Sequence, residues 1–331
     1  MSHPTTAWIA HGGRTGEDAF TAERVPVPEL RPHDLLVRVR AVSVNPVDTK
    51  VLKRLGDGES KQLGYDAAGV VEAVGERASG FAVGDEVYYA GDISRPGTNA
   101  ELHAVDSRIV AHKPANLDWA QAAALPLTTI TAWESLFDKL RLTADSRGNL
   151  LVVGGAGGVG SVLIQLAKAL TGVTVVATAS RDESRAFVRE LGADQVVGHR
   201  NLRDEVSAVA PEGVRWIFSS FTAGNLDAYQ QLLQPFGEIV AVDDDPGPIG
   251  ALKTKALSFH WEYMFARIIH ETPDVAEQGR LLARTAQLVE QGRVRTTLGQ
   301  RLAGLGPETL AEAHQILRSG TAVGKVSITL D

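Results

Sequence analysis

The stretch that decides the fold is Leu150-Leu151-Val152-Val153-Gly154-Gly155-Ala156-Gly157-Gly158-Val159-Gly160. The apolar run 150–153 predicts a buried strand, and the residues 159–170 predict a helix that begins within the glycines. A complete G-x-G-x-x-G pattern between a strand and a helix indicates a dinucleotide turn. Glycines permit the tight turn and let backbone N–H groups approach a pyrophosphate, which the helix N-terminus attracts. We therefore assign the pyrophosphate to Gly155, Ala156, Gly157, Gly158, Val159 and Gly160; the alternative is an ordinary glycine turn.

Strands and helices alternate on the C-terminal side of this turn. The expected strands are 173–177, 195–197, 216–219 and 237–242, and a helix is expected over 183–191. Alternation of this kind predicts an α/β fold, a doubly wound parallel sheet of the Rossmann type. From about Ser258 onward the chain is expected to leave this rhythm, with a helix over 275–291 and a last strand over 325–330.

The first ~120 residues, by contrast, predict a compact, barrel-like domain of short strands. The expected strands are 35–44, 69–75 and 84–90, each next to turn-forming residues. Asp118 is expected to cap a helix over 119–124 that Pro126 ends. At 331 residues the chain is long enough for about two domains.

Composition narrows the class of protein. A net charge of −7 and a pI near 5.8 argue against a nucleic-acid binder, which needs a basic face. No apolar run reaches the ~18–20 residues of a membrane span, and no signal peptide is evident at the start. We therefore expect a cytoplasmic protein that binds neither membrane nor nucleic acid. The chain has no cysteine, which removes disulfides, thiol nucleophiles and cysteine-ligated zinc.

The choice between the two nicotinamide cofactors is read about 20 residues beyond the glycines, at the end of the second strand. An NAD site usually has a carboxylate there, whereas this chain has Ser180 and Arg181. A hydroxyl beside a guanidinium binds a 2′-phosphate, so the sequence favours NADPH. Arg185, and His199 or Arg200 after the third strand, are expected to add positive charge. The alternative is that these are solvated surface residues.

The chain resembles the medium-chain dehydrogenase/reductase superfamily, specifically its quinone oxidoreductase and zinc-independent "zinc-type alcohol dehydrogenase-like" branch. Beside the glycine turn and the segment 122–133, the motifs that carry the resemblance are Asn45-Pro46-Val47-Asp48, Gly64-Tyr65-Asp66-Ala67-Ala68-Gly69, Gly84-Asp85-Glu86-Val87, Leu191-Gly192-Ala193-Asp194 and Gly324-Lys325-Val326. The resemblance implies a GroES-like substrate domain built from both chain ends (1–120 and 261–331). It also implies a Rossmann domain (121–260), a cofactor in the cleft between the domains, and a homodimer paired through the Rossmann domains.

The zinc-dependent relatives carry Cys, His and Cys as ligands of the catalytic metal, and those places correspond here to Asn45, Tyr65 and approximately Leu127. Asp66 stands where a Glu often follows the His. The histidines of this chain form no zinc motif, so no metal is expected. Without a Lewis acid to hold an alkoxide, the chemistry is expected to favour acceptors whose charge spreads over a conjugated oxygen.

By resemblance, Asn45 is expected near the nicotinamide, Tyr65 in the former metal region as a hydrogen-bond or proton donor, and Thr131 beside the nicotinamide. The alternatives are a turn residue, a core aromatic and a helix residue bonded to its own backbone. Asp48 and Asp66 are expected to be structural. Val242 and Lys325 are assigned to the cofactor site. The aromatic run 259–265 is either an apolar cleft wall or core or dimer packing.

The expected activity is therefore NADPH-dependent hydride transfer to a small conjugated carbonyl substrate, in the first place a quinone. Two alternatives stay open. One is an enone or enoyl reductase, which saturates a carbon–carbon double bond. The other is a protein that binds NADPH as a sensor or scaffold without turnover, which a fold alone never excludes.

Overall fold

The computed structural model describes residues 4–330, and the chain divides into two compact units. Unit 1 consists of Met1–Leu127 and Phe265–Asp331, and unit 2 of Thr128–Met264. The chain passes from unit 1 to unit 2 within helix α3 (Pro126–Trp133). The α/β architecture expected from the sequence, with a doubly wound parallel sheet of the Rossmann type in unit 2, is confirmed.

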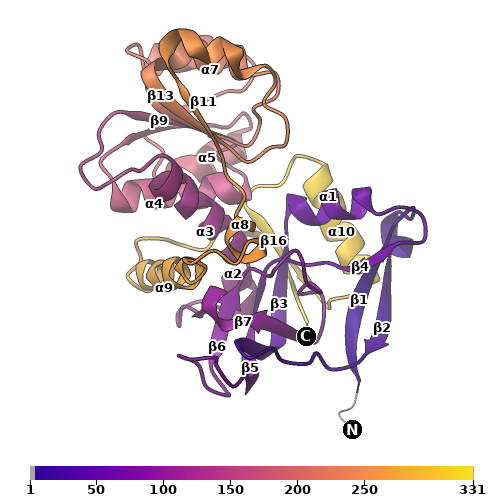
Figure 1. The fold of residues 1–331 in the computed structure, drawn as a ribbon. Helices are drawn as coiled ribbons and strands as arrows, with labels where there is room; N and C mark the ends of the chain where they lie inside the picture. Colours follow the sequence, from indigo (N-terminus) through magenta and orange to yellow (C-terminus); the bar gives the residue numbers. More distant parts are fainter. Residues whose placement is uncertain (1–3, 331) are drawn as a thin grey trace. The chain divides into compact units, whose positions relative to one another are not determined.

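Unit 2 is built on one parallel sheet of six strands in the order β11-β10-β9-β12-β13-β14 (Figure 1). Its strands are β9 Asn149–Val153, β10 Thr174–Thr178, β11 Gln195–Val197, β12 Val214–Ser219, β13 Leu233–Ala241 and β14 Ser258–Trp261. The connecting helices are α4 Gly158–Leu170, α5 Asp182–Glu190, α6 Leu202–Val209 and α7 Leu226–Leu232. Residues 150–153 are at most 2% exposed, as expected for a parallel strand covered on both faces.

The end of unit 2 differs from the expectation that the regular alternation stops near Ser258. Strand β14 extends the sheet instead, pairing in parallel with β13 from Ser258 to Trp261. The expectation was wrong because this strand is short and aromatic and only the four-residue helix α8 (Ala266–Ile269) follows it. β14 ends the sheet, and Trp261 on it is 47% exposed.

The homodimer that the resemblance implies stays a prediction, and a measurement of the molecular mass in solution tests it.

The aromatic side chains of the run 259–265 do not form one continuous surface. Phe259 packs against the core of unit 2 and meets the Trp261 ring edge-on, with ring centroids 5.1 Å apart. Tyr263 is 51% exposed, whereas Phe265 is buried. The run therefore divides between core packing and exposed rings, and neither alternative from the sequence describes all of it.

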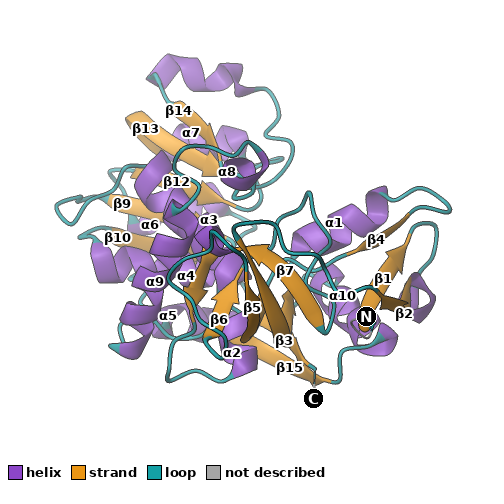
Figure 2. Cartoon of the chain, turned by 60° about the horizontal axis from the view of Figure 1, so that its bottom comes forward, coloured by secondary structure: helices purple, strands orange, loops and turns teal. Residues whose placement is uncertain are grey.

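Unit 1 brings the two ends of the chain into one sheet. Strand β16 (Lys325–Thr329) pairs antiparallel with β3 (Asp34–Val44), so that Val326 lies opposite Val44. The sheet has the order β15-β16-β3-β5-β6-β8, with β7 also on β3. Its strands β3, β5, β6, β7 and β15 are labelled in Figure 2. Its other strands are β15 Leu298–Ala303, β5 Ala67–Val74, β6 Glu86–Tyr89, β7 Leu102–Asp106 and β8 Val110–His112. A second sheet holds β2 (Phe20–Val25), β1 (Thr5–His11) and β4 (Ser60–Gln62).

The helices of unit 1 are α1 Pro46–Arg54, α2 Trp119–Ala123, α8, α9 Glu277–Glu290 and α10 Pro307–Arg318. The cap at Asp118 is confirmed, because its carboxylate accepts the Gln121 N–H at 2.9 Å. Pro126 ends α2 as expected and also opens α3, which continues as a π-helix over Glu134–Lys139. None of the helices within residues 4–330 combines the length and apolarity that a membrane span requires.

One buried histidine makes the stability of unit 1 dependent on pH. His314 on α10 is 1% exposed, packs edge-on against Phe20, and has no hydrogen-bond partner for either ring nitrogen within residues 4–330. Burial lowers the pKa of His314 from 6.5 to about 4. The unfolded chain therefore takes up a proton at a pH where the folded chain does not, and stability is lost as the pH falls from about 6.5 toward 4.

We predict that His314→Phe removes part of this acid sensitivity, because phenylalanine keeps the edge-on contact with Phe20 and has no nitrogen to protonate. A shift of this size corresponds to at most roughly 3 kcal/mol. Urea unfolding of both proteins at pH 7 and pH 5 measures the difference. The exposed His112→Gln variant is the control and should unfold with the wild-type pH dependence. The same loss between pH 7 and pH 5 in His314→Phe and the wild type would contradict the assignment.

Candidate functional site

The glycine turn joins the carboxyl end of β9 to α4 and is tied to the neighbouring strand β10. The backbone of Gly154 has φ +89°, a left-handed conformation that favours glycine. Its N–H donates to Thr178 Oγ1 at 2.9 Å, and the Gly155 N–H donates to the Thr178 carbonyl at 3.2 Å. The turn is therefore held from the β10 side by one residue.

The glycines of the motif serve different purposes. A Cβ on Gly160 would lie 2.3 Å from the Gly154 carbonyl oxygen, and one on Gly155 would lie 3.0 Å from Ala177 Cβ. Gly160 is therefore required by the packing of the turn, and a side chain on Gly155 would crowd the neighbouring strand β10. A Cβ on Gly157 would meet only the Gly154 oxygen, at 3.3 Å, so the space above this exposed residue stays open to a ligand.

The first turn of α4 offers backbone N–H groups to that space. Gly157 is the N-cap of this 13-residue helix and contributes no side-chain hydrogen bond. The N–H groups of Gly158, Val159 and Gly160 precede the first acceptors within the helix, as at every helix N-terminus. The donor set and the open space above Gly157 fit the pyrophosphate of a dinucleotide.

The residues expected to hold a 2′-phosphate follow the strands next to the turn. Ser180 and Arg181 are both exposed at the end of β10, and the Arg181 backbone exchanges hydrogen bonds with Ser184 Oγ at the start of α5. Arg185 donates to the carbonyls of Ala179 (3.0 Å) and Val196 (2.9 Å), so its guanidinium also braces the backbone. His199, with Arg200 beside it, is exposed after β11. Their contact with a phosphate stays a prediction.

Val242 lies at the carboxyl end of β13. Its N–H donates to the Ser219 carbonyl at the end of β12, at 3.1 Å. This bond keeps the ends of the two strands level, at the edge of the sheet where ligands bind in open α/β folds. Whether Val242 contacts the cofactor stays a prediction.

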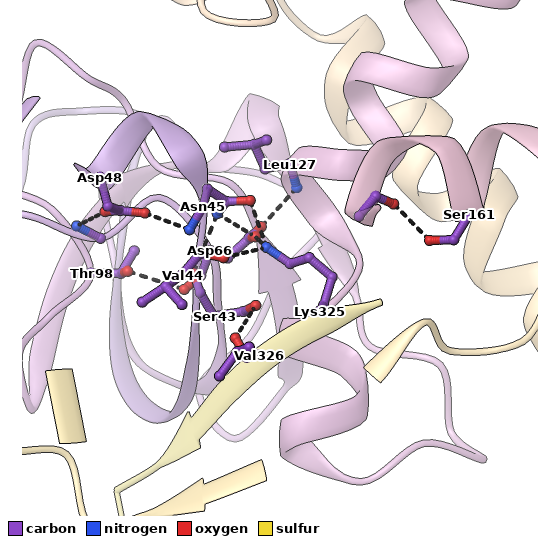
Figure 3. A network of polar contacts seen from close by, with 12 residues as sticks. Ser43, Val44, Asn45, Asp48, Asp66, Thr98, Leu127, Ser161, Lys325 and Val326 are labelled. Carbon is purple, nitrogen blue, oxygen red and sulfur yellow. Dashed lines mark hydrogen bonds and ion pairs between the residues drawn. The ribbon is translucent and has the colours of Figure 1, made fainter. Parts of the chain in front are cut away.

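In unit 1 a buried network joins Asn45, Asp66 and Lys325, whose polar groups point toward one another in Figure 3. The Lys325 ammonium donates to the Val44 carbonyl (2.8 Å), Asn45 Oδ1 (2.5 Å) and Asp66 Oδ2 (3.2 Å). The Asn45 amide donates to Asp66 Oδ2 (2.8 Å) and to the Ser43 carbonyl (3.3 Å). All three side chains are at most 4% exposed. The Lys325 ammonium thus has three hydrogen-bond acceptors within the chain, and its expected contact with the cofactor stays a prediction.

Asp66 is the centre of the network. Its second oxygen, Oδ1, accepts the N–H of Leu127 at 2.7 Å, in the first turn of α3. Burial raises the pKa of Asp66, and the Lys325 charge together with the hydrogen bonds from Asn45 and Leu127 opposes that rise. Burial likewise lowers the pKa of Lys325, against the attraction of Asp66. The opposite charges of Asp66 and Lys325 therefore favour each other's charged form against the effect of burial.

A second buried carboxylate fixes the backbone beside Asn45. Asp48 accepts the Asn45 N–H at 2.8 Å and the Gly64 N–H at 2.9 Å. Burial raises the pKa of Asp48 to about 7, although both backbone donors and Lys325 act in the other direction. Asp48 thus sets the start of α1 and the approach to Tyr65, in agreement with the structural role expected from the sequence.

The positions that hold zinc ligands in the metal-dependent relatives are unsuited to a metal ion in this chain. Asn45 supplies an amide already bound to a carboxylate and an ammonium, and Leu127 supplies an apolar side chain. Both oxygens of Asp66 accept hydrogen bonds, and the Lys325 cation would repel a second cation. Across residues 4–330 no cluster of three or more His, Cys, Asp or Glu side chains could bind a metal. This donor set does not fit zinc.

Tyr65 and Thr131, the other expected catalytic residues, lie in different units. Tyr65 is fully buried directly before Asp66, and its ring meets Phe265 edge-on with centroids 5.4 Å apart. Thr131 lies on α3 and is 6% exposed. Their catalytic roles stay predictions. The sequence did not single out the partnership of Asp66 with Lys325, which lies 259 positions further along the chain. The nearest signal was the motif Gly324-Lys325-Val326 itself.

Each of the two units matches a known protein family. Residues 31–115 match the family model "Alcohol dehydrogenase GroES-like domain", and residues 158–259 match the model "Zinc-binding dehydrogenase". The chain is 39% identical to a zinc-type alcohol dehydrogenase-like protein of Staphylococcus aureus, with 93% of each chain covered. It is 31% identical to the chloroplastic NADPH-dependent alkenal/one oxidoreductase of Arabidopsis thaliana, over 97% of this chain and 78% of that protein.

Solved structures show the same fold. A Rhizobium etli protein described as a zinc-dependent alcohol dehydrogenase has a TM-score of 0.93 and 45% identity, with 99% of each chain covered. A quinone oxidoreductase from Coxiella burnetii has a TM-score of 0.82 and 25% identity, again over 99% of each chain.

The buried network yields a prediction for stability. We expect Lys325→Met to lower the free energy of unfolding by about 3–5 kcal/mol, because it leaves the Asp66 carboxylate buried without its cation. In the double variant with Asp66→Asn, the loss should be smaller than the sum of the two single losses by more than about 1 kcal/mol. Urea unfolding of the four proteins measures this coupling.

The control is the exposed pair Lys168 and Asp194, which lies on the surface of unit 2 with an N–O distance of 2.9 Å. Lys168→Met should cost at most about 1 kcal/mol, as is usual for exposed ion pairs. Strictly additive losses at Lys325 and Asp66 would show that the two side chains do not depend on each other.

Proposed function

The chain belongs to the medium-chain dehydrogenase/reductase superfamily, and from that premise we propose that it is a zinc-independent, NADPH-dependent reductase of conjugated carbonyl compounds. The Asn45–Asp66–Lys325 network carries this proposal. Of the three positions that correspond to zinc ligands in the metal-dependent relatives, Asn45 has its amide bound to Asp66 and Lys325, and Tyr65 and Leu127 supply a phenol and an apolar side chain. The word zinc in the names of some relatives describes those proteins and does not supply ligands here.

The choice of acceptor follows from the charge that the reaction must accommodate. A simple ketone concentrates negative charge on one oxygen, for which a Lewis acid is worth several kcal/mol. In a quinone or an enone, hydride arrives at an electron-poor carbon and the charge spreads over a conjugated system. Ordinary hydrogen-bond donors are then sufficient. The residues of this chain suit the second case.

Bound NADPH would supply the hydride, and the chain supplies placement and hydrogen bonds. The first turn of α4 holds the pyrophosphate, and Ser180 with Arg181 holds the 2′-phosphate. Asn45 acts as a positioning residue, because its amide hydrogens already donate to Ser43 and Asp66. We assign to Tyr65 the hydrogen bond that stabilises the carbonyl oxygen of the substrate. Its neighbour Asp66 is fixed by Leu127 and Lys325.

Quinones and enones are both consistent with this site. The sequence placed quinones first, and the quinone oxidoreductase from Coxiella burnetii supports them at 25% identity. The Arabidopsis thaliana relative, named for alkenals and alkenones and for NADPH, is 31% identical over nearly the whole chain. The name of that relative favours enones. We therefore treat quinones and enones as equally supported candidate acceptors.

A panel of acceptors tests the proposal directly. We expect NADPH oxidation, followed by its absorbance, with quinones or enones and at least about 100-fold lower kcat/KM with simple ketones. Tyr65→Phe should lower kcat while leaving the Kd of NADPH unchanged. Prior treatment with a chelator should leave the rate unaltered. Preference for ketones, or loss of activity with the chelator, would refute the mechanism; tight NADPH binding without any turnover would support the sensor.

The cofactor preference rests on Arg181, and Arg181→Asp tests it. Aspartate is a good N-cap, so α5 should remain intact while the charge next to the 2′-phosphate is reversed. We expect NADPH to bind about 10- to 100-fold more weakly, the value of a lost charge-assisted hydrogen bond, and NADH to be little affected. Calorimetric titration of both cofactors measures this. The matched control is Arg189→Gln on the last turn of the same helix; equal losses for the two cofactors would remove Arg181 from the phosphate site.

A further inference from the structure

Phe221 is an exposed aromatic side chain next to the glycine turn. It lies in the loop after β12, at the carboxyl end of the parallel sheet, and is 59% exposed. A Cβ on Gly154 would lie 3.3 Å from Phe221 Cε2, so the ring borders the first glycine of the turn. Single exposed apolar residues are common on protein surfaces, and exposure alone would assign it no role.

The backbone of Phe221 is held on both sides. Its N–H donates to Ser219 Oγ at 3.0 Å, and its carbonyl accepts from Asn225 Nδ2 at 2.8 Å and from the Tyr229 hydroxyl at 2.9 Å. Ser219 and Tyr229 are fully buried and lie within hydrogen-bond distance of each other, at 2.9 Å. Two buried hydroxyls therefore fix the backbone that carries this exposed ring.

The following residues tie this loop to the next one. Asp243 Oδ2, after β13, accepts the N–H groups of Thr222 (2.5 Å) and Ala223 (3.3 Å). Thr222 Oγ1 and Asp243 Oδ1 are also buried, and neither has a hydrogen-bond partner within the described residues 4–330. The two loops are thus tied together through the backbone that follows Phe221.

The position of the ring indicates which part of a dinucleotide it meets. β9 lies between β10 and β12 in the sheet, so Ser180 and Phe221 follow the strands on either side of the glycine turn. Gly154 and Gly155 lie between them and have no side chains. A 2′-phosphate at Ser180 and Arg181 sits on the same ribose as the adenine base, which therefore lies within one sugar of the end of β10, above these glycines.

We propose that Phe221 forms the aromatic wall of the adenine subsite and stacks on the face of the base. This inference rests on the proposed NADPH dependence and adds a residue to that cofactor site. Because the loop backbone is already held before binding, the ring can stack on a base without the cost of ordering the loop. Stacking of this kind tolerates any purine, so Phe221 contributes affinity, and the choice between NADPH and NADH remains with the residues after β10.

Binding of an adenosine fragment separates the adenine from the rest of the cofactor. Phe221→Ala is titrated calorimetrically with NADPH and with 2′,5′-ADP, which contains the adenine, its ribose and both phosphates but no nicotinamide. We expect the Kd of both ligands to rise by a similar factor, about 5- to 100-fold, the usual effect of losing one base–aromatic stack. Phe221→Trp should bind both ligands about as tightly as the wild type.

Phe236→Ala is the matched control. Phe236 is 67% exposed on the same sheet, but it lies toward the amino end of β13, where Leu233 pairs with Val214, and Phe221 follows the carboxyl end of β12. This variant should bind both ligands like the wild type. A loss for NADPH without a loss for 2′,5′-ADP would place the ring at the nicotinamide or the acceptor and overturn the inference, as would no loss for either. Failure of the wild type to bind either ligand would overturn the proposed NADPH dependence, and this inference with it.

Discussion

The ion pair between Lys325 and Asp66 is the contact on which the candidate site in unit 1 depends. It joins the last strand of the chain to the start of β5, and Asp66 also holds the N–H of Leu127 at the point where the chain leaves the unit. A buried ion pair gives little net stability compared with apolar residues of the same volume, but it is costly to break. Its value here is in position, because one carboxylate fixes the amide of Asn45, the first turn of α3 and the end of β16 together.

The two units contribute different kinds of polar group to the candidate site. Unit 2 presents backbone N–H groups at the glycine turn, where Gly160 is required by packing, Gly155 lies tightly against β10 and Gly157 leaves space for a ligand. Unit 1 presents side chains, and most of their donors are already committed to one another. A mechanism that needs only modest stabilisation of a delocalised charge is compatible with such a site, since its donors are held in fixed positions before any substrate arrives.

The fold could be predicted from the sequence wherever the signal is local. The strand 150–153, the glycines and the helix after them identify unit 2 within about 20 residues, and Asp118 identifies the start of α2. The site was less predictable. Asn45 and Lys325 were expected to face the cofactor, but their engagement with each other depends on strands β3 and β16 becoming neighbours, which no local pattern reveals. The hydrogen bonds that hold the backbone of the Phe221 loop likewise come from Tyr229 and Asp243, residues that sequence alone gives no reason to associate with it.

The position of β16 within its sheet also determines when the protein can finish folding. This strand lies between β15 and β3, so unit 1 has a central gap until residues 325–329 are in place. Unit 2 uses only residues 128–264 and has its full sequence well before synthesis ends. On the ribosome unit 2 can therefore become compact before β3 of unit 1 is able to pair with β16. A nascent chain that stops before residues 325–329 would have a folded unit 2 and an unpaired sheet edge in unit 1. Such an edge is either bound by a chaperone or left free to aggregate.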